Sequence, residues 1–335
     1  PRLRPPPLSG LRQCAAVLAV LTVTFPFFAL VLCGYVATQA RVLPLTAIGG
    51  LNSFVLFFAL PCMLYRFGAN TPIAQLLDPV VALIYLLCGL LVVAGAVAAT
   101  VRRWGWNDAA FGALVTAFPN SGFMGVPLLV ALLGPAAAGP AILTMLVDMV
   151  VTSSLCVALS RLDDGQGHGR AAMLDAARKA LRGVAANPMP WAILGGALAS
   201  YLEWRLPAPV EKTAWLLADA ASPVALFTIG AVLARSQIQA SHPMPLSDYL
   251  PVALMKLLLH PLLVLAVGAT AMQWGAGLSP FALTVMVLTA ALPSASNVSL
   301  LAERMGADNG RIARIILVST ALAFLSFSGA VALLT

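Results

Sequence analysis

Residues 118–127 read FPNSGFMGVP, and residues 292–299 read LPSASNVS. Each motif places a proline, followed by small, amide- or hydroxyl-bearing residues, within an apolar stretch long enough to cross a bilayer. Because proline lacks a backbone donor and clashes with the preceding turn, we expect a helix to break at each motif. Freed backbone groups are tolerated at membrane depth only where protein or a watery cavity satisfies them. Paired breaks in the two halves of a chain are typical of the binding site of a secondary transporter.

The composition also indicates a membrane protein. The chain of 335 residues is 61% hydrophobic and 9% charged, whereas a soluble domain carries roughly 25% charged residues. The net charge of +7 could suggest nucleic-acid binding, but the basic residues fall mostly between apolar stretches, where they set membrane topology. We therefore predict an all-α membrane protein with the lipid bilayer, and no nucleic acid, as its partner.

The apolar stretches predict ten transmembrane helices, grouped five and five. They cover approximately residues 14–38, 43–66, 79–101, 108–133, 139–161, 188–204, 210–234, 248–274, 279–303 and 309–334. We expect residues 1–162 to form a first repeat, 163–187 a cytoplasmic linker, and 188–335 a second repeat. An odd number of helices per repeat makes homologous halves inverted relative to each other. The two breaks then fall in the fourth and ninth helices.

The distribution of lysine and arginine predicts the orientation. With both termini outside, most loop Lys and Arg residues lie on the inner side, including Arg102, Arg103, Arg178 and Arg182. Cytoplasmic loops carry such an excess. The prediction is a multi-pass protein of the cytoplasmic membrane with the central linker inside.

The breaks supply the candidate binding residues. A half-helix that starts after a break presents free N–H groups and a partial positive charge, which suits an anion. The candidates are Pro119, Asn120, Ser121, Gly122, Pro293, Ser294, Ser296 and Asn297, with Asn52 from the second helix. The alternative interpretation is two kinked helices whose Ser and Asn side chains join neighbouring helices.

Lys256 is a further candidate for substrate binding. It lies within the predicted helix 248–274, with His260 one turn later on the same face. An ammonium inside a membrane helix is expected to face a cavity or a partner, and here it could offset the charge of an anionic substrate. The alternative is a side chain that extends to the cytoplasmic interface.

Asp148 is the candidate for ion coupling. It lies near the middle of the predicted helix 139–161, with Thr144 and Thr152 four residues before and after it. A carboxylate at this depth is costly unless it is protonated, paired or hydrated. It could carry a proton, bind Na⁺ with the two threonines, or pair with Lys256 as a structural ion pair.

The motifs resemble those of a known family. Residues 118–129, 291–294, 52–55 with 59–61, 187–188 and 217–220 are similar, in order, to segments of the auxin efflux carrier family. The likeness is greatest to bacterial members often assigned to malonate, malate or other organic-acid transport. The central linker is shorter than in many plant members, and the Ser294–Asn297 segment differs from theirs, so specificity for a plant hormone does not carry over.

The resemblance implies a fold similar to that of the bile-acid sodium symporters. Helices one, two, six and seven would form a scaffold that dimerises, and helices three to five and eight to ten a moving unit. Substrate would bind between them, as in an elevator mechanism. The expectation is a secondary transporter of small organic anions in the bacterial inner membrane, without a cofactor or metal but with possible coupling to H⁺ or Na⁺.

Three other classes of protein are alternatives to a secondary transporter. A channel would need a sustained polar stripe or ring of charge along the helices, which is lacking in the sequence. An enzyme is not expected, because neither a GxSxG nor an HExxH motif occurs. A membrane sensor that binds organic anions without transporting them stays open as an alternative.

Overall fold

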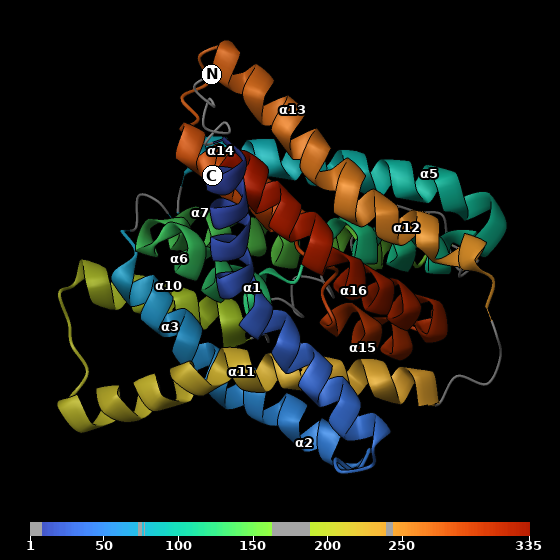
Figure 1. Cartoon of the computed structure of the whole chain (residues 1–335), viewed down its shortest axis with the longest axis horizontal. Coiled ribbons are helices and arrows are strands. Elements are labelled where there is room, and N and C mark those ends of the chain that lie inside the picture. The colour runs from blue at the N-terminus through green and yellow to red at the C-terminus, as the bar shows by residue number, and fades with distance from the viewer. Residues whose placement is uncertain (1–8, 73–75, 77, 163–187, 239–243) are drawn as a thin grey trace, which may run out of the picture.

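The computed structural model describes residues 9–72, 76, 78–162, 188–238 and 244–335. The described part of the chain is helical, and its helices pack into one bundle (Figure 1). Seven of these helical segments are long and apolar enough to cross a membrane. The predicted linker over 163–187 lies outside the described residues.

The helices follow one another along the chain with several π-helical turns between them. The elements are α1 (Ser9–Gln39), α2 (Ala47–Phe54), η1 (Val55–Ala59), α3 (Leu60–Asn70), α5 (Pro79–Ala117), η2 (Ser121–Gly125), α6 (Val126–Leu133), η3 (Pro135–Ala137), α7 (Ala138–Val147), η4 (Asp148–Thr152), α8 (Ser153–Leu159), α10 (Pro188–Tyr201), α11 (Ala208–Ile238), η5 (Leu246–Asp248), α12 (Leu250–Leu254), η6 (Met255–Leu259), α13 (His260–Gln273), α14 (Pro280–Ala291), α15 (Asn297–Arg304) and α16 (Asn309–Leu334). The π-helical turns are η1, η2, η4 and η6.

Both predicted helix breaks are present. α5 ends at Ala117 and the chain resumes as η2 and α6, while α14 ends at Ala291 and resumes as α15. The prolines that follow the ends cannot donate the next helical hydrogen bond. The breaks leave two shorter apolar helices, Ser121–Leu133 and Pro280–Ala291, which do not count among the seven long ones.

Two predicted helices meet at a kink within the range of α5. The stretches 79–101 and 108–133 were expected to be separated by a loop, but α5 runs through the first and into the second. Gly105 sits inside α5 with φ = 76°, a left-handed conformation that favours glycine. The backbone of Gly105 is not helical, so the chain turns sharply there from one helix into the next, as the sequence predicted, with a tight kink in place of a longer loop.

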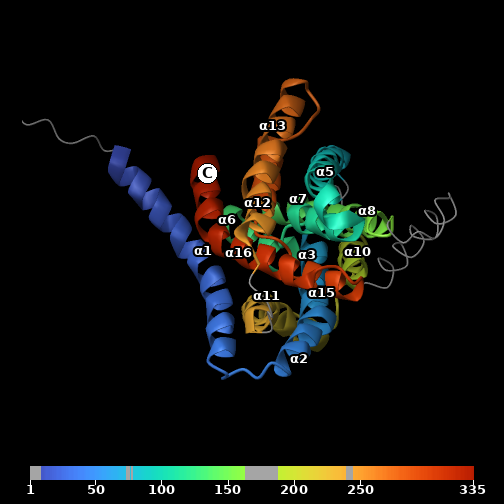
Figure 2. The same cartoon turned by 90° about the vertical axis from the view of Figure 1, so that its right-hand side faces the viewer.

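Two helix pairs cross at glycines with their backbones in close contact. A Cβ on Gly34 of α1 would overlap the carbonyl of Phe227 on α11, and a Cβ on Gly230 of α11 would overlap that of Val31 on α1. Figure 2 shows α1 at the edge of the molecule beside α11 and α16. Small residues allow this approach between membrane helices.

The second pair repeats the arrangement. A Cβ on Gly68 of α3 would overlap the carbonyl of Ile193 on α10, and a Cβ on Gly196 of α10 would overlap that of Tyr65 on α3. In all four cases, the contacted carbonyl belongs to the residue three positions before the glycine of the opposite helix. The same local geometry thus joins α1 to α11 and α3 to α10.

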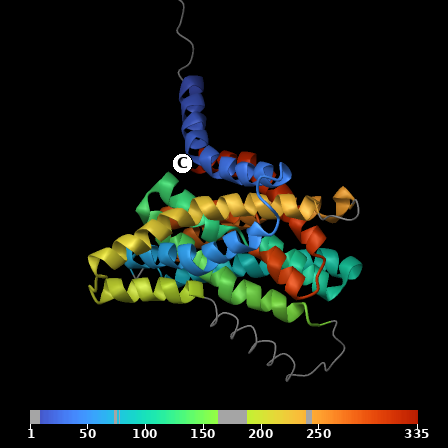
Figure 3. The same cartoon turned by 90° about the horizontal axis from the view of Figure 1, so that it is seen from below.

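These contacts divide the described helices into two sets. We call α1, α2–α3, α10 and α11 the frame helices; α11 runs beside α2 and α3 (Figure 3). The remaining helices, α5 to α8 and α12 to α16, are called the crossing helices because they include both breaks. Residues of both sets contribute to the main hydrophobic core.

Candidate functional site

The two interrupted segments meet and pair with each other. The N–H of Asn120 donates to the carbonyl of Pro293 at 2.8 Å, and the N–H of Ala295 donates to the carbonyl of Phe118 at 3.0 Å. Pro119 and Ser294 form an isolated antiparallel bridge between these bonds. Backbone groups released by one break are thus satisfied by the other, which is how irregular backbone is tolerated inside a membrane protein.

Asn120 lies at the start of the helix that follows the first break. Its carbonyl accepts from the N–H groups of Met124 and Gly125 at 3.2 and 2.9 Å. The residue is 4% exposed, and its side chain makes no hydrogen bond within the described ranges. A buried amide without a partner is available to a ligand.

The second break carries two further polar atoms without partners. Ser294 donates its N–H to the Ser319 hydroxyl at 3.3 Å, but its own hydroxyl is buried and has no hydrogen-bond partner in the described part of the chain. The same holds for Oδ1 of Asn297. Buried polar atoms normally have a partner, so these two are candidates for ligand contact.

A small cavity lies where the breaks face the frame helices. Three sequence-predicted residues line it, namely Asn52, Ser296 and Asn297. Its volume is about 20 Å³, enough for roughly one water molecule. In this conformation the space that these three residues share is therefore too small for an organic anion.

The rest of the cavity wall is apolar and was not predicted. It consists of Val55, Leu56, Phe123, Ala225, Ile229 and Val232. Such residues carry no polar signal in the sequence, and they resemble any other helix position that faces a core. Among these six residues, only Phe123 could have been predicted to line the site, because it belongs to the motif at the first break.

Asp148 is fully buried in a network of hydroxyl groups. Tyr85 of α5 donates to Oδ2 at 3.0 Å, and Thr152 donates to Oδ1 at 3.0 Å. Of the two threonines predicted to lie around Asp148, only Thr152 forms a hydrogen bond with it. Thr144 donates instead to the carbonyl of Ala141 at 2.8 Å, since its hydroxyl is within reach of the preceding turn. Tyr85 was missed, although a single tyrosine inside an apolar helix was a visible signal.

Lys256 is also fully buried, so its ammonium does not extend to the membrane interface. It contacts the carbonyl of Ala290 at 2.9 Å and Nδ1 of His260 at 3.2 Å. Lys256 does not line the small cavity in this conformation. Its charge instead lies at the last turn of α14, directly before the second break.

The two charged residues belong to one buried cluster. The ring of Tyr85 lies 5.9 Å from that of His260, centroid to centroid, and links the Asp148 side to the Lys256 side. The side chains of Asp148 and Lys256 form no direct ion pair among the described residues. Asp148 begins η4 and Lys256 lies in η6, and π-helical turns are frequent at functional sites.

A helical membrane protein whose interrupted helices pair beside a cavity with a few polar residues in its wall has the construction of a membrane transporter. The chain belongs to the membrane transport protein family, that of the auxin efflux carriers, whose sequence model matches residues 19–331. The family membership and the long apolar helices make it an integral, multi-pass membrane transport protein.

Curated relatives cover most of the chain. A protein of Rhizobium meliloti (strain 1021) named "Putative malonate transporter" is 28% identical over 310 residues, which cover 91% of this chain and 92% of that protein. An uncharacterized transporter of Methanothermobacter thermautotrophicus is 27% identical over 305 residues, 89% of this chain and 92% of its own length. The uncharacterized transporter YfdV of Escherichia coli (strain K12) is 27% identical over 197 residues, 59% of each chain.

Proposed function

We propose that this protein is a secondary transporter of small organic anions, namely mono- or dicarboxylates, across the bacterial cytoplasmic membrane. The main observation behind this proposal is that the two breaks pair through Asn120 and Pro293. They do so beside a cavity whose wall includes Asn52, Ser296 and Asn297. The similarity to a protein named as a malonate transporter supports the substrate class.

The site would hold a carboxylate with uncharged donors. The buried hydroxyl of Ser294 lacks a partner within the described residues, where the side chain of Asn120 makes no hydrogen bond either, and the N–H of Asn297 stands at the first position of α15. The partial positive charge at this end favours an anion. Ser121 and Gly122 would contribute backbone of the corresponding turn after Pro119.

Lys256 would assist electrostatically from behind the break. Its bond to the carbonyl of Ala290 places a positive charge at the C-terminal end of α14, where the helix dipole is negative. Without that charge, an anion beside the break would experience the negative end of α14. Lys256 therefore offsets charge near the site without contacting the substrate in this conformation.

The chain would consist of two inverted repeats of five transmembrane helices, residues 1–162 and 188–335, joined by a cytoplasmic linker over 163–187. The reciprocal glycine contacts support this relationship. Inversion would exchange the first helix (α1) with the sixth (α10), and the second (α2–α3) with the seventh (α11). The contact between α1 and α11 would then correspond to that between α10 and α3.

Transport would proceed by an elevator movement of the crossing helices against the frame helices. The ion pairs between described residues fall within one set each: Arg66–Asp219 joins frame helices, whereas Arg103–Asp248 and Arg311–Asp108 join crossing helices. Hydrogen bonds between the sets include Thr24–Ser328 at 3.3 Å and Ser222 to the Phe123 carbonyl at 3.4 Å. Such long bonds are weak and easily exchanged.

Asp148 would couple transport to an ion, either H⁺ or Na⁺. A buried carboxylate is stable when it is neutralised or fully hydrogen-bonded, and here two hydroxyl groups supply part of that stabilisation. Thr144 would join only after a rotation of its side chain. The link through Tyr85 and His260 to Lys256 gives a route by which occupancy of Asp148 affects the break.

We further propose a homodimer formed through the frame helices, with both termini outside. Large apolar side chains on frame helices are exposed in the single chain, including Leu32 (61%), Phe57 (63%) and Phe58 (58%). Lipid or a second copy would cover them.

Uptake into liposomes tests the proposal. Purified protein would be reconstituted and offered labelled malonate, malate or an indole acid under an imposed H⁺ or Na⁺ gradient. We expect saturable uptake of one anion, accelerated by one gradient. Conductance that never saturates would indicate a channel, and binding without uptake would indicate a sensor; either result contradicts the proposal.

A further inference from the structure

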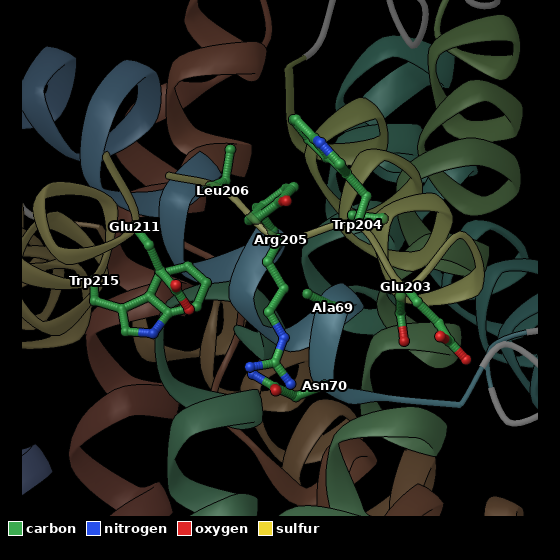
Figure 4. Close-up of a pocket in the computed structure, with 11 residues that line it drawn as sticks. Ala69, Asn70, Glu203, Trp204, Arg205, Leu206, Glu211 and Trp215 are labelled. Carbon is green, nitrogen blue, oxygen red and sulfur yellow. The ribbon is translucent and has the colours of Figure 1, made fainter. Parts of the chain in front are cut away.

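A second, larger cavity lies among the frame helices, away from the breaks. It has a volume of about 560 Å³ and is bounded by the end of α3, the end of α10 and the first turns of α11. Figure 4 shows Glu211 and Trp215 on one side of it and Glu203 and Trp204 on the other, with Arg205 extending between them. The proposed anion transport makes no use of this cavity.

Three charged side chains line the cavity without partners. Glu203, Arg205 and Glu211 make no ion pair or side-chain hydrogen bond within the described part of the chain, although all three face the same space. Two carboxylates and one guanidinium leave the lining with an excess of negative charge. A small organic anion is therefore repelled here, whereas a group carrying an ammonium is attracted.

Aromatic side chains add to the attraction for a cation. Tyr65, Trp204 and Trp215 line the cavity, and the face of an indole ring binds ammonium and guanidinium groups. The guanidinium of Arg66 already lies 5.9 Å from the ring centroid of Trp215. The ring of Tyr65 packs against Trp215 at 6.3 Å, which holds this wall in place.

The cavity also offers a place for a negative group. Arg205 extends across it towards Asn70 in the view of Figure 4. A guanidinium recognises phosphate and carboxylate oxygens through paired N–H donors. Amine-binding and anion-binding groups thus line a single space, with Arg205 between the two glutamates.

We propose that this cavity binds a zwitterionic amine headgroup, with its ammonium held by Glu203 and Glu211 and its phosphate or carboxylate held by Arg205. Both a phosphatidylethanolamine lipid and a free zwitterion carry this chemistry. The surroundings suit the lipid, because Tyr201, Leu202 and Trp204 beside the cavity are 72%, 61% and 59% exposed. Tyrosine and tryptophan at helix ends are typical of the membrane interface. An occupant would join the ends of α3, α10 and α11.

Binding measurements on the intact protein test the site without any transport assay. Delipidated protein would be titrated with phosphatidylethanolamine, with phosphatidylglycerol, and separately with soluble phosphoethanolamine, and bound lipid would be counted by native mass spectrometry. The variant is Glu203→Gln with Glu211→Gln. The matched control is Glu303→Gln, an exposed glutamate on α15.

We expect phosphatidylethanolamine to bind at least tenfold more tightly than phosphatidylglycerol in the wild type and in the Glu303→Gln control, and the double variant to lose this preference. Comparable binding of soluble phosphoethanolamine would support the site and identify a free zwitterion as its source. Equal binding of the two lipids by the wild type would overturn the proposal, whatever the folding of the variant. A preference kept unchanged in the double variant would overturn it as well.

Discussion

The backbone N–H of Asn120 donates a 2.8 Å hydrogen bond to the carbonyl of Pro293, a residue of the other half of the chain. The reciprocal bond from Ala295 to Phe118 makes the contact two-sided. Neither interrupted segment can shift alone without leaving buried backbone groups unpaired, which is costly in a low-dielectric environment. The two breaks therefore form one mechanical unit, as a binding site carried by moving helices requires.

Asn52→Ala tests the contribution of the frame helices to the site. Asn52 lines the small cavity, so its loss should remove about one hydrogen bond to the substrate, a decrease of about 3- to 10-fold in uptake at low substrate concentration. Ser53→Ala is the matched control, because the Ser53 hydroxyl bonds to Gly49 on the same helix. Equal uptake by the two variants would remove Asn52 from the site.

Asp148→Asn tests the assignment of the coupling ion site. The substitution keeps the size of the side chain but removes the charge that would bind or release a cation. We expect accumulation driven by an ion gradient to be lost, while exchange of internal for external substrate continues. Asp78→Asn is the control, since asparagine can replace the aspartate that caps α5. Unchanged gradient-driven accumulation by the Asp148 variant would contradict the assignment.

Much of the fold could be predicted from the sequence. The long apolar stretches indicated a helical membrane protein, and Pro119 and Pro293 indicated the breaks, because proline acts locally and independently of packing. The separation of two helices near Gly105 was also predictable, because glycine and the adjacent Arg102 and Arg103 suit a break. The tightness of the kink could not be predicted, because these residues equally suit a longer loop.

A cross-link between the helix sets tests the elevator movement. The hydroxyls of Thr24 on α1 and Ser328 on α16 lie 3.3 Å apart, close enough for a disulfide after replacement of both residues by cysteine in a background without other cysteines. Oxidation should abolish uptake, and reduction should restore it, because the bond ties a frame helix to a crossing helix.

The control cross-link lies within the crossing helices. Ser299 and Asn309 are in contact at 2.5 Å between Oγ and Oδ1, and a disulfide between cysteines at these positions should leave uptake largely intact. Full transport by the oxidised Thr24–Ser328 pair would show that the two helix sets do not move past each other there.

Gly34→Ala tests the close contact between α1 and α11. The added methyl group would overlap the backbone carbonyl of Phe227, which cannot give way as a side chain can. The expected cost is about 1–3 kcal/mol, seen as a lower apparent melting temperature in detergent. Gly95→Ala is the control, since no atom lies within 4 Å of its added Cβ. A Gly34 variant as stable as this control would refute the contact.

The candidate site was predictable only where its residues carry polar groups. Asn120, Ser294 and Asn297 stood out because amides and hydroxyls are unusual in the middle of apolar stretches. The place of Lys256 was not predictable, because its bond to Ala290 depends on how α14 packs against η6. Sequence spacing put Thr144 and Thr152 on the same face as Asp148, but only Thr152 makes contact, because the hydroxyl of Thr144 donates to the carbonyl of Ala141 instead.

Counterflow of labelled malonate in liposomes tests the central claim most directly. Vesicles loaded with unlabelled malonate and containing the wild-type protein should transiently accumulate the label, because a carrier exchanges substrate at a single alternating site. The Asn120→Ala variant, at equal amount and with an unchanged gel-filtration profile, should not. Transient accumulation by the variant equal to that of the wild type would contradict an anion site at the paired breaks.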